Sequence, residues 1–144
     1  MPAFWIVSDT VWGSGHHTAS ALFHFHPDNK TPVIMERGIR TANSDANLLI
    51  FALNPEKVEI VTYYGSREPF RGWFSSSYGK EVPAFEAEFR TEGNLPLRCD
   101  YLLLPYRGTE MPALEVLECK KSGNSGKRIW IIRIQKTIFK ECIS

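Results

Sequence analysis

The chain has 144 residues, of which 43% are hydrophobic and 12% aromatic, so it can bury the core of one globular domain and is not biased enough to be disordered. Its 17 basic and 16 acidic residues almost cancel, which argues against a large phosphate-binding surface and so against nucleic acid as a partner. No apolar run approaches about 18 residues and the first ten residues lack a secretory-signal pattern, so we expect no membrane span or signal peptide, and the localisation stays open.

The first strand-like segments flank a glycine-containing turn. Residues 3–13 are rich in β-branched and aromatic side chains, and residues 13–15, Gly-Ser-Gly, have the composition of a turn. Residues 16–27 form the next strand candidate, which ends at a proline. We therefore predict that residues 3–13 and 16–27 pair as a hairpin across this turn.

The second of these segments contains the run Leu-Phe-His-Phe-His-Pro, which alternates in character. Because successive side chains of a strand point to opposite faces, Phe23 and Phe25 share one face, while His24 and His26 share the other. We predict that the phenylalanines face the core. The imidazoles could be metal ligands, a catalytic base, sugar-contacting groups, or half-buried strand residues with no chemistry.

Later segments continue the β pattern. The segment 67–85 is rich in Gly, Ser and aromatic residues and is predicted to be a long, irregular loop, and residues 122–126 have the composition of a Gly-rich hairpin loop. Further strand candidates occupy residues 31–43, 46–56, 57–66, 86–106, 113–121, 127–136 and 137–144.

Short strands at close spacing, with turn residues between them and no amphipathic helix, are typical of an antiparallel β-sandwich. No linker, repeat or low-complexity segment divides the chain. The sequence therefore predicts an all-β fold with little or no helix, arranged as one domain over residues 1–144. The three cysteines have no metal-type spacing and are expected to be reduced.

Two longer stretches carry a resemblance to a known family. The first is SDTVWGSGHHTASALFHFHPD, in which an Asp precedes a Gly-containing turn and an aromatic-His strand that ends in Pro. The second is EPFRGWFSSSYGKEVPAFEAEFRTEGNLPLRCDYLLLPY, a Gly-aromatic-x-Ser loop followed by strands that end in Leu-Leu-Pro. In this order, over residues 6–106, they resemble the C-terminal β-sandwich region of heparinase II/III-like polysaccharide lyases.

This resemblance implies an activity and a partner. The family joins an N-terminal helical toroid to C-terminal β-sheets and cleaves acidic, uronate-containing polysaccharide by β-elimination, with a Tyr acid/base in the toroid. The 144 residues already form strands and leave no room for a toroid. We therefore expect a chain that is inactive alone and that would need a toroid in cis or in trans. The alternative is a non-catalytic carbohydrate-binding or structural module.

The resemblance also suggests metal ligands. Some members of the family hold a metal at the sheet region with two His and one Asp, and Asp9 and His24 match two of these three positions. Imidazole and carboxylate ligands suit a zinc-like ion. The other family His is not matched here, although His26 could substitute for it. We therefore expect an Asp9–His24 contact, with a divalent metal in the full-length enzyme and no tight metal binding by this chain.

The aromatic segment near residue 73 has two interpretations. Trp73 and Tyr78 could stack on sugar rings while Arg71 pairs with a uronate carboxylate, which makes these three residues candidates for substrate binding. Alternatively, Trp73 and Tyr78 fold inward and fix the loop on the sandwich. A Ser-His-Asp hydrolase is not supported, because the chain has no G-x-S-x-G segment.

Overall fold

The computed structural model describes residues 3–29, 31–54, 57–122 and 127–143, and within these ranges it has strands and no helix. The all-β prediction is therefore confirmed. Within the same ranges, no helix is long and apolar enough to cross a membrane. The chain forms two compact units, one of residues 3–109 and one built from residue 110 onward. The single domain expected over residues 1–144 stays a prediction.

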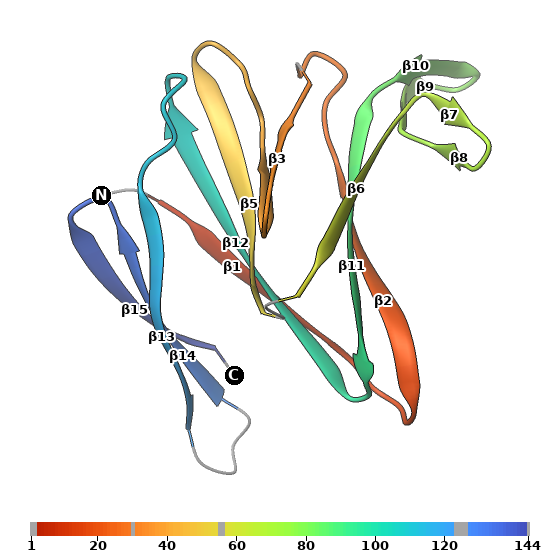
Figure 1. The fold of residues 1–144 in the computed structure, drawn as a ribbon. Helices are drawn as coiled ribbons and strands as arrows, with labels where there is room; N and C mark the ends of the chain where they lie inside the picture. Colours follow the sequence, from red (N-terminus) through yellow and green to blue (C-terminus); the bar gives the residue numbers. More distant parts are fainter. Residues whose placement is uncertain (1–2, 30, 55–56, 123–126, 144) are drawn as a thin grey trace. The chain divides into compact units, whose positions relative to one another are not determined.

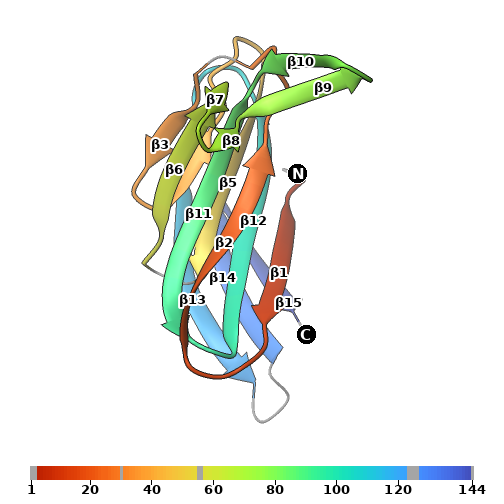
Figure 2. The same ribbon diagram turned by 90° about the vertical axis from the view of Figure 1, so that its right-hand side faces the viewer.

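The two main sheets of the larger unit are antiparallel (Figure 1, Figure 2). One has five strands in the order β1-β12-β5-β4-β3, and the other has three strands in the order β2-β11-β6. The strands of the first sheet are β1 (Trp5–Val11), β12 (Leu97–Arg107), β5 (Ala46–Asn54), β4 (Gly38–Arg40) and β3 (Val33–Met35), and those of the second are β2 (His16–His24), β11 (Phe85–Asn94) and β6 (Glu59–Tyr64).

The core lies where alternate side chains of the two sheets meet. Phe89 of β11 is fully buried, and its ring makes edge-to-face contacts with Phe23 at 5.3 Å and Tyr101 at 5.5 Å between ring centroids. Phe25 is also buried, whereas the His24 side chain is 61% exposed. The predicted faces of this strand are therefore confirmed.

The predicted hairpin between the first two strands is wrong. β1 pairs with β12 in the five-stranded sheet, and β2 pairs with β11 in the three-stranded sheet, so residues 12–15 cross from one sheet to the other (Figure 2). Gly15, with φ of +83°, allows this crossing. A hairpin and a crossing between sheets can use the same turn residues. Here the first two strands cross because each pairs with a different long strand, β1 with β12 and β2 with β11.

The segment predicted to be an irregular loop is ordered as two small hairpins, which we call the flap (Ser66 to Pro83). Gly72 must be glycine, since its φ is +73° and an added Cβ would lie 2.8 Å from the backbone of Tyr63. The flap strands are β7 (Ser66–Arg67), β8 (Phe70–Arg71), β9 (Trp73–Ser77) and β10 (Lys80–Pro83).

The smaller unit is a three-stranded antiparallel sheet in the order β13-β14-β15. Its strands are β13 (Leu114–Ser122), β14 (Lys127–Ile134) and β15 (Thr137–Ile143), so the predicted strands of this region are confirmed. The predicted Gly-rich loop falls mainly on residues 123–126, which lie outside the described residues.

Candidate functional site

The two proposed metal ligands belong to different sheets. Asp9 lies in β1 opposite Cys99, and His24 ends β2 opposite Glu86. β2 has nine residues and runs away from the crossing at residues 12–15, so at about 3.3 Å per residue it carries His24 about 26 Å from that end. No hydrogen bond or ion pair within the described ranges joins Asp9 to His24. The expected contact is therefore not formed, because the hairpin that would have produced it does not exist.

His24 instead pairs with an acidic residue on the outer face of the three-stranded sheet. Its Nε2 lies 3.1 Å from Oε2 of Glu86, whose side chain is only 6% exposed. The same carboxylate oxygen accepts a 3.4 Å hydrogen bond from the backbone N–H of Gly72. His24 is thus an exposed imidazole above a buried carboxylate.

Arg71 is the centre of the charges on this face. Its Nε donates to Oε1 of Glu86 at 2.6 Å, and its terminal nitrogens contact Glu86 and Glu88. The guanidinium also lies 4.1 Å from the ring centre of Tyr63, a cation–π distance. Burial opposes its charge, but the hydrogen bonds that it donates to the two carboxylates outweigh this, so the pKa of Arg71 is raised. Arg71 therefore anchors the flap to β11, and its donors already serve the protein's own carboxylates.

A second arginine completes this group. Arg90 donates to Oε2 of Glu88 at 3.0 Å and to the Tyr63 hydroxyl at 2.8 Å. The bond from Arg90, with smaller contributions from Ser20 and Arg71, outweighs burial and lowers the pKa of Glu88 to about 2. We call this group the outer-face cluster, and its members are His24, Tyr63, Arg71, Glu86, Glu88 and Arg90.

The lowered pKa of Glu88 predicts a loss of stability in acid. Since the folded-state pKa is about 2 and the ordinary value is 4.5, the stabilisation is present above pH 4.5 and disappears as the pH falls toward 2. The unfolding free energy of the unchanged chain, measured with urea, should therefore fall more steeply over this interval than that of Glu88→Gln. The exposed Glu36→Gln variant is the control and should follow the unchanged chain. If the unfolding free energies of the unchanged chain and of Glu88→Gln change with pH in parallel, the lowered pKa of Glu88 would be contradicted.

A hollow of about 310 Å³ lies beside the two histidines. His24 and His26 line it together with Asn43 and Asn47. The amides are used internally: Asn47 accepts from the Asn43 backbone N–H at 2.8 Å and donates to its carbonyl at 2.9 Å. His26 lies 3.4 Å from the Asp28 carboxylate. The two histidines therefore have separate acidic neighbours and do not converge on one point as ligands would.

The described residues contain no group of three or more His, Cys, Asp or Glu side chains that could hold a metal ion. His24 has a carboxylate partner that is already bonded to Arg71, and Asp9 is on the other sheet. These residues do not fit a zinc-like centre by themselves. A metal site in a longer enzyme stays a prediction.

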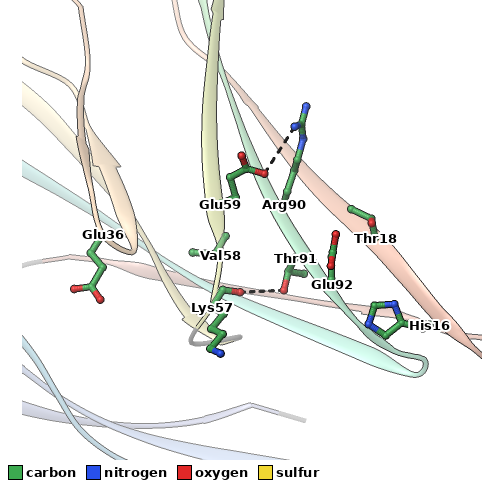
Figure 3. A pocket seen from close by; sticks show the side chains of 9 residues that line it. All are labelled: His16, Thr18, Glu36, Lys57, Val58, Glu59, Arg90, Thr91 and Glu92. Atoms are coloured by element: carbon green, nitrogen blue, oxygen red, sulfur yellow. Dashed lines mark hydrogen bonds and ion pairs between the residues drawn. The ribbon is translucent and has the colours of Figure 1, made fainter.

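A larger hollow of about 590 Å³ lies near the other end of the same sheet (Figure 3). Its ionisable lining residues are of both signs, and Arg90 is paired with its cross-strand neighbour Glu59 at 3.8 Å. Because acidic side chains outnumber the cations, the hollow is poorly suited to a polyanion. Those ionisable residues are His16, Glu36, Lys57, Glu59, Arg90 and Glu92.

The two predicted aromatic contacts differ in their surroundings. The Trp73 ring is partly buried, stacks on Phe70 and donates from Nε1 to the Ser66 carbonyl at 2.7 Å, so it fixes the flap. Tyr78 is fully exposed at the tip of the β9–β10 hairpin, which makes the inward-folding interpretation wrong for this residue.

The sequence hypotheses missed Glu86 and Glu88, the buried partners of Arg71. In β11 they follow an alternation that predicts a solvent-facing side, but Arg71 of the flap contacts both of them and they are buried. Two glutamates spaced by two and followed by Arg90 were the available signal of a charged row on one strand face.

Comparison by sequence finds no matching family model and no matching curated protein. Comparison of structures does find matches. Heparan sulfate lyase HepC from Pedobacter heparinus superposes with a TM-score of 0.80 at 19% identity, and a mutant of it with 0.81 at 18% identity. The chain has the fold of part of this lyase. The matches cover 97% of the chain but 22% of the lyase, so the chain spans about a fifth of that protein's length. The predicted resemblance is confirmed at the level of the fold.

Proposed function

We propose that the chain is the β-sandwich part of a polysaccharide lyase that acts on acidic, uronate-containing polysaccharide by β-elimination. In this proposal it contacts the polysaccharide, and a helical toroid in cis or in trans supplies the acid and base. The observation that carries the proposal is the likeness to heparan sulfate lyase over 97% of the chain.

The chemistry of the outer-face cluster supports a non-catalytic role for the isolated chain. A general base works best when its pKa lies near the operating pH. Glu88, with a pKa of about 2, is too weak a base to remove a proton from a sugar carbon, and the carboxylate of Glu86 accepts hydrogen bonds from Arg71 and from the Gly72 backbone. The carboxylates of the cluster therefore organise the sheet and the flap.

Incubation of the chain with heparan sulfate, heparin or alginate tests this proposal. We expect retention on immobilised heparan sulfate and no rise in the ultraviolet absorbance of unsaturated uronate. Product formed by the chain alone would contradict the division of roles. Retention without product after a toroid partner is supplied would instead favour a non-catalytic carbohydrate-binding module.

A further inference from the structure

The tight hairpin of β7 and β8 presents a cation and an aromatic ring side by side. Arg67 and Phe70 are cross-strand partners, so their side chains project from the same face. The Arg67 guanidinium lies 4.2 Å from the ring centre of Trp73 and 5.8 Å from that of Phe70. The Phe70 and Trp73 rings are parallel within 6° at a centroid distance of 5.6 Å.

The flap beneath these side chains is held in place by hydrogen bonds, while Arg67 and Phe70 themselves are exposed to solvent. Trp73 is held by its hydrogen bond to Ser66, and the flap is held by Arg71 on β11. In contrast, the Arg67 side chain is 67% exposed and Phe70 is 58% exposed. A large aromatic residue that served only to anchor the flap would be buried, as Trp73 partly is.

We propose that Arg67 and Phe70, supported by Trp73, form a platform that binds an anionic sugar unit of an acidic polysaccharide. This inference rests on the proposed function and names the contact surface for its substrate. The apolar ring would cover one face of the sugar, and the planar guanidinium would pair with a carboxylate or sulfate beside it. Arg71 and Arg90 do not offer this, because their donors serve Glu86 and Glu88.

Glu81 limits the strength of the platform. Its carboxylate pairs with Arg67 at 2.8 Å and is itself 42% exposed. An incoming carboxylate or sulfate therefore competes with Glu81 for the same guanidinium. Neutralising Glu81 should consequently strengthen binding of an acidic polysaccharide, an effect that a purely structural Arg67–Glu81 pair would not produce.

Affinity electrophoresis and calorimetric titration with heparan sulfate test the platform. We expect Arg67→Gln and Phe70→Ala each to weaken binding by about fivefold, the size of one exposed charge-assisted or stacking contact. Phe70→Trp, which keeps an aromatic face, should retain binding. Glu81→Gln should tighten binding by about twofold to fivefold.

The chain offers a matched control pair in Arg107 and Asp45, which are exposed and lie 3.8 Å apart. Arg107→Gln and Asp45→Asn make the same charge changes away from the flap and should alter the affinity much less. Far-ultraviolet circular dichroism of every variant separates lost binding from lost folding.

Other results of these binding experiments would contradict the platform, the anionic ligand or the proposed function. If the unchanged chain binds but the flap variants behave like the control pair, the platform is overturned and the proposed function stands. If Phe70→Ala weakens binding to neutral dextran and heparan sulfate alike, the assignment of an anionic ligand is overturned. If the folded, unchanged chain does not bind heparan sulfate, the proposed function itself is overturned.

Discussion

Replacing Arg71 with methionine is expected to lower the unfolding free energy by about 3–5 kcal/mol, the usual loss when one partner of a buried charge pair is removed. The Glu86 and Glu88 side chains are 6% and 7% exposed, and each contacts Arg71. Methionine keeps the apolar stem but leaves both carboxylates buried without this cation. Urea unfolding at neutral pH measures the loss.

Two controls make this result specific. Arg107→Met removes an arginine whose side chain is 88% exposed, and should cost less than about 1 kcal/mol. Acidification provides the second control, because protonation of Glu88 removes a buried charge that has lost one of its two arginine partners in Arg71→Met, while it weakens the unchanged chain. The difference between the two proteins should therefore narrow below about pH 4, near the ordinary pKa of Glu. A loss under about 1 kcal/mol, or a difference that widens in acid, would show that Arg71 is not the anchor.

Truncating Phe89 to alanine is expected to cost about 3–5 kcal/mol, because it removes a fully buried ring and leaves a cavity between the sheets. Phe23 and Tyr101 contact this ring edge to face, so neither sheet can close the space without losing other contacts. The loss is large compared with the total stability of about 5–15 kcal/mol that is common for domains.

The matched control for this core substitution is Leu22→Ala. Leu22 lies on the next strand but on the outer face, where it is 48% exposed, and its truncation should cost about 1 kcal/mol or less. Denaturant unfolding of both variants measures the two losses of unfolding free energy. Equal losses for Phe89→Ala and Leu22→Ala would mean that the core is not where the two sheets place it.

Local alternation was enough to predict β2 and the faces of its side chains, but not the four short strands of the flap. Phe23, Phe25 and His24 point as expected because a period of two fixes the face of every residue once the core side is known. Strand pairing was not predictable from the turn at residues 13–15, since glycines serve both a hairpin and a crossing between sheets. The predicted Asp9–His24 contact was wrong for this reason.

In the candidate site, too, features that depend on neighbouring residues could be predicted from the sequence, and contacts between distant segments could not. Trp73 was given two possible roles from the sequence, and its contacts with Ser66 and Phe70 support the structural one. The partners of Arg71 were not predictable, because Glu86 and Glu88 become buried only when a segment about fifteen residues earlier folds across their strand. When a distant segment buries a charged side chain, the hydrophobic periodicity of the sequence does not show it.

The most direct measurement is a nuclear magnetic resonance titration of the full chain with a heparan sulfate oligosaccharide. The account predicts saturable shifts of backbone amides that centre on Arg67, Phe70 and Trp73, with smaller shifts along β11 beneath the flap. A folded chain whose amide signals do not change at high oligosaccharide concentration, or change only outside the flap, would contradict it.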